Sequence, residues 1–441
     1  MSVPGSRVRT LEERLRSAKA AARPRGYGRI RSVIGMSVAV EGVDAAIGEA
    51  VALHLPSGEL LAQVVAIDDG SLVCMPLGEI AGARAGARAE LVPGRLSVPA
   101  GDGLRGRVLD ALGRPVDGGP ALTRVEWLPA TGTPPHPLRR AMVDTQLSLG
   151  VRALDALLAC GRGQRMGIFA GSGVGKSSLL SMIARGTDAD ISVLALVGER
   201  GREVREMIEN DLGPDGLARS VVVVATSDEP ALMRLQAAQT ATRIAEWFRD
   251  NGRHVVLMMD SLTRFCMAQR EVGLSAGEPP ATRGYPPSVF ALLPRLLERA
   301  GAGERGSITG LYTVLVEADD MNDPVGDAAR SILDGHIVLS RKLATSGHFP
   351  SIDVLESVSR VAPRVVAPEQ LGQAIELRRL MAAYRDARDL IEIGAYQKGS
   401  NPVVDRAVQL QPAIDRFLRQ DMDERAPLAE TRAALAMVVS P

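Results

Sequence analysis

The chain has 441 residues, of which 46% are hydrophobic and 24% are charged, and its formal net charge is zero. This length is typical of two or three domains, and the composition is that of a folded globular protein, not of a disordered or fibrous one. No apolar run is long enough to cross a bilayer, and the N-terminus lacks the apolar core of a signal peptide. We therefore expect a cytosolic protein.

Residues 1–27 form a basic N-terminal arm. Nine lysines and arginines lie between Met1 and Arg31, against only Glu12 and Glu13. Such a segment can be a frayed charged terminus, a helix that binds a partner, or a contact with anionic lipids. The arm therefore predicts a partner or a peripheral membrane contact, with a solvated end as the simpler alternative.

Residues 28–93 are predicted to form a small β-barrel domain. Short segments of alternating polarity follow one another, bounded by Gly, Pro or Asp. Closely spaced short strands of this kind are typical of a barrel. The predicted strands cover residues 30–40, 48–55, 60–67 and 71–75.

Residues 94–367 are predicted to form an α/β domain. They begin with a Gly- and Pro-rich connector up to residue 137. Apolar runs then alternate with helical segments, and runs that are apolar throughout indicate strands buried on both faces of a parallel sheet. These runs cover residues 166–170, 191–197, 221–226, 255–260, 308–316 and 337–339.

Residues 368–441 are predicted to form a helical C-terminal domain. The β-branched runs stop at Pro368, and three helical segments follow at residues 370–384, 396–418 and 427–438. The expected fold is thus a multidomain α/β protein with an N-terminal barrel and C-terminal helices.

A Gly-rich loop between a strand and a helix is the strongest chemical signal. Glycines let successive N–H groups point at a phosphate, and the following helix adds the positive end of its dipole. The first Gly of the G-x-x-x-x-G-K-[ST] pattern is an alanine here. The predicted Mg-ATP loop consists of Ala170, Gly171, Ser172, Gly173, Val174, Gly175, Lys176, Ser177 and Ser178. Within it, Lys176 would reach the β- and γ-phosphates, and the Ser177 hydroxyl would bind Mg²⁺.

Two acidic residues end apolar runs downstream of this loop. Asp260 ends residues 255–260 and predicts the second protein ligand of Mg²⁺, with a helix N-cap as its alternative. Glu199 closes another run and predicts the group that positions the attacking water. A surface ion pair of Glu199 with Arg200 or Arg202 is the alternative.

Six motifs, taken together, resemble the rotary ATPase superfamily and, more closely, the flagellar type III export ATPases. The similarity runs from about residue 28 to the C-terminus. The motifs are G-S-G-V-G-K-S at 171–177, V-G-E-R-G-R-E-V at 197–204, M-D-S-L-T-R-F at 259–265, G-E-P-P-A-T-R-G-Y-P-P-S at 277–288, D-G-H-I-V-L-S-R-K at 334–342 and S-G-H-F-P-S-I-D at 346–353.

The resemblance implies roles for four residues. Glu199 matches the carboxylate that polarises water, and Arg200 matches its neighbour at the γ-phosphate. Phe349 matches the aromatic ring that packs on adenine, where the family often has Tyr. Arg360 matches the arginine finger that enters the site of the neighbouring subunit, and such a finger contributes roughly 10³ to 10⁵ in rate.

Because this chain carries Lys176, Glu199 and Arg360 together, copies of itself can form complete sites. A finger supplied in trans needs head-to-tail contacts, and these close into a ring when the rotation permits. The family precedent is a homohexamer. The resemblance also implies contacts with a stalk-like export regulator, with the export gate and with chaperone–substrate complexes, at the inner face of the bacterial membrane.

Other functions remain alternatives at this point. A catalytic subunit of an F- or V-type ATP synthase and a virulence-type secretion ATPase share the site. A scaffold that binds nucleotide without hydrolysis would not need Glu199. An RNA translocase would need aromatic residues in the barrel, and only Tyr27 precedes Trp127. We therefore expect no nucleic-acid partner.

Overall fold

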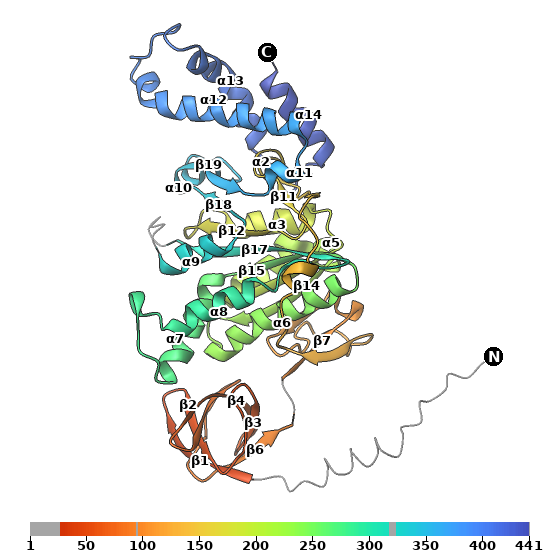
Figure 1. The fold of residues 1–441 in the computed structure, drawn as a ribbon, viewed down its shortest axis with the longest axis vertical. Helices are drawn as coiled ribbons and strands as arrows, with labels where there is room; N and C mark the ends of the chain where they lie inside the picture. The colour runs from red at the N-terminus through yellow and green to blue at the C-terminus, as the bar shows by residue number, and fades with distance from the viewer. Residues whose placement is uncertain (1–26, 94–95, 317–322, 441) are drawn as a thin grey trace, which may run out of the picture. The chain divides into compact units, whose positions relative to one another are not determined.

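We describe a computed structural model of the chain, in which residues 27–93, 96–316 and 323–440 are placed. The chain forms two compact units, Met1–Arg95 and Leu96–Pro441. Figure 1 shows the elements of each unit along the chain. The predicted basic arm lies outside the described residues, apart from Tyr27.

The first unit contains a closed six-stranded barrel, as the sequence predicted. Its strands pair in the order β1-β2-β5-β4-β3-β6. Alternate side chains such as Val38, Val40 and Val64 point into its core. The predicted strand at residues 30–40 is in fact two strands, because Gly35 has a φ of +56° and turns the chain. The strands are β1 (Tyr27–Ile34), β2 (Ser37–Glu41), β3 (Ala50–Leu55), β4 (Gly58–Asp68), β5 (Ser71–Pro76) and β6 (Arg88–Val92).

A nine-stranded sheet forms the centre of the second unit. Its main path runs β19-β18-β12-β17-β15-β13-β14-β8, with β16 beside β17. The pairs from β18 to β8 are parallel, and the apolar runs are buried on both faces, as predicted. The strands are β8 (Val108–Asp110), β12 (Arg165–Ala170), β13 (Ile191–Glu199), β14 (Ser220–Thr226), β15 (His254–Asp260), β16 (Gly301–Ala302), β17 (Ser307–Leu315), β18 (Gly335–Leu339) and β19 (Ile352–Ser359).

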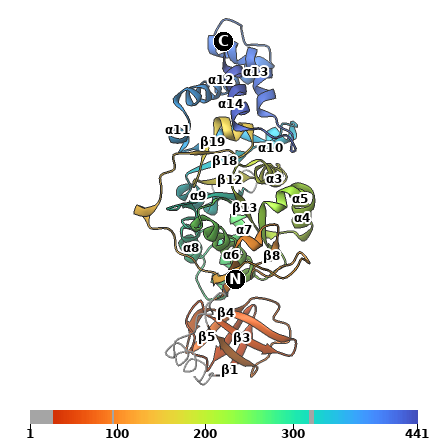
Figure 2. The ribbon, with the colours of Figure 1, turned by 90° about the vertical axis from the view of Figure 1, so that its right-hand side faces the viewer.

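Helices cover both faces of this sheet, which Figure 2 shows edge-on. One face carries α3 (Lys176–Gly186), α4 (Gly201–Glu206) and α5 (Gly213–Ala218). The other carries α6 (Ala231–Asp250), α7 (Leu262–Ser275), α8 (Pro287–Leu297) and α9 (Pro324–Ile332). The shorter elements are β7 (Ser97–Ala100), β9 (Glu126–Pro129), β10 (Gln146–Leu147), α2 (Arg152–Leu157), β11 (Cys160–Gly161), a π-helical turn (Met207–Leu212), α10 (Arg341–Thr345) and α11 (Ala362–Val365).

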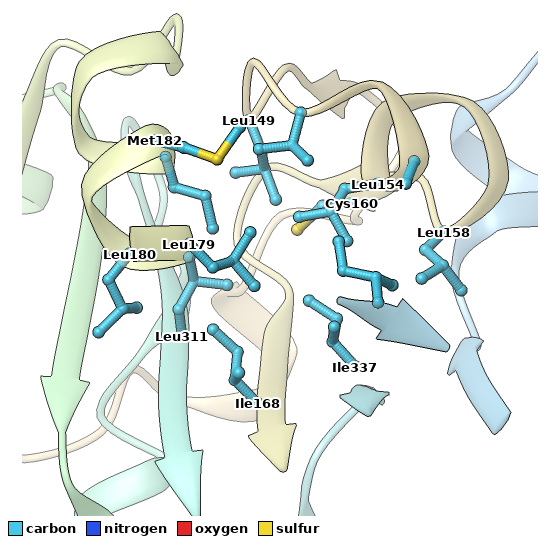
Figure 3. Packing of buried hydrophobic residues seen from close by; sticks show 14 of the residues in the cluster. Leu149, Leu154, Leu158, Cys160, Ile168, Leu179, Leu180, Met182, Leu311 and Ile337 are labelled. Atoms are coloured by element: carbon cyan, nitrogen blue, oxygen red, sulfur yellow. The ribbon is translucent and has the colours of Figure 1, made fainter. Parts of the chain in front are cut away.

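The C-terminal helices α12 (Pro368–Glu392), α13 (Pro402–Leu418) and α14 (Leu428–Val439) belong to the same compact unit. Leu377, Ile414 and Leu435 are almost fully buried and join the apolar cluster that contains Ile168 and Leu179. Figure 3 shows the centre of that cluster, where α2 and α3 pack on the sheet. Among the described helices, none has the length and apolarity needed to cross a bilayer.

Candidate functional site

The phosphate loop lies between β12 and α3, in the order that the sequence predicted. Gly173 and Gly175 have φ values of +76° and +94°, which favour glycine, and Gly175 caps the start of α3. Ala170 is still part of β12 and pairs with Leu315 and Leu339 on both sides. Because its backbone is extended, an alanine fits where the pattern has glycine.

Lys176 joins the two acidic residues that ended separate apolar runs in the sequence. Its Nζ donates to Glu199 Oε1 at 3.2 Å and to Asp260 Oδ1 at 2.5 Å. The Thr313 hydroxyl, from β17, also donates to Asp260 Oδ1 at 2.7 Å. The side chains of Lys176, Glu199 and Asp260 are 12%, 16% and 4% exposed. The structure thus brings three predicted site residues together, with the Lys176 ammonium largely enclosed between the two carboxylates.

The electrostatics of this cluster follow from burial and proximity. Burial raises the pKa of the Glu199 carboxyl above its ordinary value, and the Asp260 charge adds to that rise, while Lys176 opposes it. For Lys176, burial lowers the pKa, but the two carboxylates outweigh it and the net shift is upward. Lys176 therefore stays charged and shares its proton donors between two competing acceptors.

The oxygen ligands predicted for Mg²⁺ lie at this end of the sheet. Ser177 is exposed on the first turn of α3, and the Asp260 carboxylate is in contact with Lys176 of the same turn. Within the described residues, no cluster of three or more His, Cys, Asp or Glu could hold a metal by itself. Mg²⁺ typically keeps several waters and takes substrate phosphate oxygens, so one hydroxyl and one carboxylate fit it.

Phe349 stands beside the phosphate loop. A Cβ added to Gly175 would lie 3.7 Å from the Phe349 ring, which is 48% exposed at this position. Two hydrogen bonds tie the surrounding segment to the loop: Ser351 Oγ donates to the Val174 carbonyl at 2.5 Å, and Arg341 donates to the Ser172 carbonyl at 3.2 Å. The loop thus has a solvent-facing aromatic surface next to it, which suits a stacked base.

The structure does not bring the other two predicted arginines to Lys176. Arg200 is on the surface and pairs with the partly buried Glu203 at 3.3 Å, a surface contact that contributes little. The backbone N–H of Arg360 donates to the Asp334 carbonyl at 3.0 Å, and its side chain is exposed. The roles of both arginines stay predictions.

Two residues of the site were missed in the sequence. Arg264, in the first turn of α7, packs against Gly198, and its Nε is buried without a hydrogen-bond partner among the described residues. The M-D-S-L-T-R-F motif could have indicated Arg264, since it follows Asp260 closely. Thr313 gave no signal, because it lies inside an apolar run and its hydroxyl matters only through Asp260.

Two family models match the chain. Residues 150–359 match the nucleotide-binding domain of the ATP synthase alpha/beta family, and residues 366–437 match the C-terminal domain of the type III secretion ATPase EscN. Together they cover the sheet apart from β8, the phosphate loop and nearly all of the three C-terminal helices.

Relatives and solved structures agree with these matches. The chain is 52% identical to the flagellum-specific ATP synthase of Bacillus subtilis, over 93% of this chain and 94% of the relative. It is 48% identical to the type 3 secretion system ATPase of Xanthomonas euvesicatoria, over 97% of each chain. The assembled ATPase EscN of enteropathogenic E. coli superimposes with a TM-score of 0.89 at 47% identity, covering 94% of this chain and 100% of EscN.

Two kinds of evidence indicate the same family. One is the phosphate loop with the acidic residues that end β13 and β15, and the other is a sequence identity near one half over almost the full length. The chain belongs to the family of flagellum-specific ATP synthases and type III secretion ATPases, and it is an ATPase of protein export.

Proposed function

We propose that the chain hydrolyses Mg-ATP at the Lys176 site, as a homo-oligomeric ring, to energise flagellar protein export. The observation that supports this most strongly is the contact of Lys176 with both Glu199 and Asp260. In this contact an ammonium suited to phosphate, a carboxylate suited to a metal and a carboxylate suited to water lie at one end of one sheet, which supports the proposal. The same geometry would serve a virulence-type system.

In this proposal each side chain has one task. The loop N–H groups and Lys176 bind the phosphates and offset the charge that develops during transfer. Ser177 and Asp260 would hold Mg²⁺, which supplies further charge neutralisation when bound. Glu199 accepts a hydrogen bond from the attacking water and orients it, and its raised pKa makes it a better proton acceptor. Phe349 packs on the adenine.

Arg360 is at the wrong end of the sheet to act in its own subunit. Ser359 pairs with Gly335, at the start of β18, and Asp334 just before it bonds to Arg165, at the start of β12. The phosphate loop begins at the opposite end of that strand. The six residues of β12 span five steps of about 3.3 Å each, so the two ends lie roughly 17 Å apart, beyond the reach of an arginine side chain.

This placement favours a finger supplied in trans. An exposed arginine, fixed by its backbone and far from its own phosphate loop, is suited to enter the site of a neighbouring copy. Contacts of this head-to-tail kind generate a closed ring or an open filament. We propose a ring of six copies, in which every interface joins Lys176 and Glu199 of one chain to Arg360 of the next.

The partners of this chain are proposed from its relatives. EscN has been solved in complex with its central stalk EscO, in an alignment that covers 94% of this chain at 46% identity. We propose that this chain likewise binds a stalk-like export regulator, besides the export gate and chaperone–substrate complexes. It would act in the cytoplasm, peripherally at the inner face of the membrane, with the basic arm in contact with lipid.

A mixing experiment tests the proposal. Arg360→Ala and Glu199→Gln subunits are each expected to be nearly inactive, by about 10³-fold or more for Arg360→Ala. Mixed at concentrations where rings form, they should recover part of the wild-type rate, because some interfaces combine an intact Glu199 with an intact Arg360. The measurement is phosphate release, with ring formation followed by mass.

As a control, two separate preparations of the same variant are mixed. No interface in these rings combines an intact Glu199 with an intact Arg360, so the mixture should stay inactive. Inactive mixed rings of proven composition would contradict the trans arrangement. A wild-type chain that binds ATP but releases no phosphate would contradict hydrolysis itself and favour a nucleotide-binding scaffold.

A further inference from the structure

The chain segment around the end of α13 contacts elements that surround the nucleotide site. We call residues 417–425 the C-terminal clasp. It begins in the last turn of α13, and its polar groups bond to segments that are distant in the sequence. These are the loop that carries Phe349, the start of α2 and the end of the phosphate-loop helix α3.

Gln420 is the centre of the clasp. Its backbone N–H donates to the Phe349 carbonyl at 3.0 Å. Its side-chain oxygen accepts from the Arg152 N–H at 2.8 Å, and its amide donates to the carbonyls of Gly150 and Glu424 at 2.8 and 2.9 Å. Gln420 itself is only 4% exposed, and its bond to the Gly150 carbonyl is buried.

Neighbouring residues hold the clasp on three sides. Arg419 donates to the Gly347 carbonyl at 3.3 Å, two residues before Phe349. Arg152 bonds to the Phe417 carbonyl at 3.0 Å and forms an ion pair with Glu424. Arg185, in the last turn of α3, reaches Asp423 and the Met422 carbonyl at 2.7 Å. The clasp is therefore bound to α2 and α3 as well as to the loop that carries Phe349.

The Phe349 ring itself is poorly held. It is half exposed, and the hydrogen bonds near it come from the chain on either side: Ser351 to the phosphate loop, and Gln420 to its own carbonyl. A side-chain change at Gln420 would remove the partner of the buried Gly150 carbonyl and of the partly buried Arg152 N–H and Glu424 carbonyl. An unsatisfied buried group is costly, so the clasp would shift and release the Phe349 carbonyl.

We propose that Gln420 is a positioning residue that sets the Phe349 ring for base binding, so that the C-terminal helices control affinity for the adenine and not for the phosphates. This inference rests on the proposed stacking role of Phe349. It predicts that nucleotide affinity and the arrangement of α13 and α14 depend on each other.

The test compares Gln420→Met with Gln411→Met. Methionine has nearly the same length but makes no amide hydrogen bonds. Gln411 lies in α13, shortly before Gln420 in the chain, and its side chain donates locally to Asp415 at 3.0 Å, so its substitution is a matched control. For Gln420→Met we expect the KM for ATP to rise about tenfold, within the range of base stacking, with little change in kcat. For Gln411→Met we expect wild-type values.

Two further measurements separate positioning from a general structural role. Inorganic tripolyphosphate lacks a base, so its inhibition constant should be the same in the wild type and in Gln420→Met. In a Phe349→Ala background, Gln420→Met should raise the KM for ATP no further, because coupled residues are not additive. Equal losses for ATP and tripolyphosphate, or full additivity, would overturn the proposal.

If Gln420→Met does not fold, Arg419→Met gives the same test at the surface. It removes only the bond to the Gly347 carbonyl and should raise the KM for ATP about threefold, within the net contribution of one hydrogen bond, again with tripolyphosphate inhibition unchanged. An unchanged KM would count against the clasp. An inactive wild-type chain would instead contradict the proposed function, so the two failures are distinguishable.

Discussion

The two ends of the hairpin formed by β18 and β19 differ in what they hold. At one end, the connection between the strands carries Phe349 and bonds to the phosphate loop through Ser351 and Arg341. At the other end, the backbone N–H of Arg360 donates to the Asp334 carbonyl, and the residue is exposed. One edge of the sheet thus contributes to its own site at one end and presents a group to a second molecule at the other.

The charges at the Arg360 end show how this is achieved. Arg165 pairs with Asp334 at 3.1 Å and also with Glu298, which in turn pairs with Arg140 at 3.1 Å. The Asp334 carbonyl accepts the Arg360 N–H. The network fixes the backbone and satisfies its own charges, so Arg360 is left available. At the phosphate-loop end, by contrast, Lys176 is enclosed and already paired.

The largest effect is expected from a substitution at the phosphate-loop end alone. Lys176→Ala should abolish hydrolysis, by about 10³-fold or more, because the phosphates lose the charge that offsets the transition state. The fold should survive, since burial raises the pKa of the Glu199 carboxyl and favours its neutral form once Lys176 no longer opposes this. Phosphate release measures the loss of hydrolysis, and thermal unfolding measures whether the fold survives. Wild-type turnover would disprove the assignment of the phosphate loop.

A somewhat smaller effect separates binding from chemistry at the same end. Glu199→Gln should lower kcat by roughly 10² to 10⁴, while ATP affinity changes little, because the amide keeps its shape but cannot accept a proton. The Glu199 pKa is raised, so wild-type activity should fall as the pH drops toward that value from above. The acid limb should disappear in the variant. Equal losses of affinity and rate would indicate a structural ion pair.

The smallest effect concerns the exposed end. Asp334→Asn keeps the carbonyl that accepts the Arg360 N–H but weakens the pairing with Arg165. We expect kcat to fall several-fold with ATP affinity unchanged, since only the alignment of Arg360 is loosened. Glu304→Gln, which removes an exposed pair with Arg139 at 4.0 Å, is the matched control and should have no effect. A change in ATP affinity for Asp334→Asn would show that the two ends are not independent.

The sequence by itself determined the local features of this protein. Alternation predicted the barrel, continuous apolar runs predicted the parallel sheet, and the phosphate loop was recognised from its glycines and Lys176. Glu199 and Asp260 were found because each closes a buried strand. All of these signals are contained in short windows, where periodicity and residue type reflect the immediate environment of the backbone.

Only the tertiary structure decided which of these features meet. Lys176 follows β12, and Asp260 ends β15, and β17 lies between these two strands in the sheet. β17 also supplies Thr313, which donates to Asp260. Likewise β8 has three residues, too few for a periodic signal, and joins the sheet only through pairing with β14. Gln420 lies 268 residues from Arg152, and nothing near either residue indicates their hydrogen bond. Strand order and long-range packing bring such groups together, and their free energy comes from burial across the whole unit.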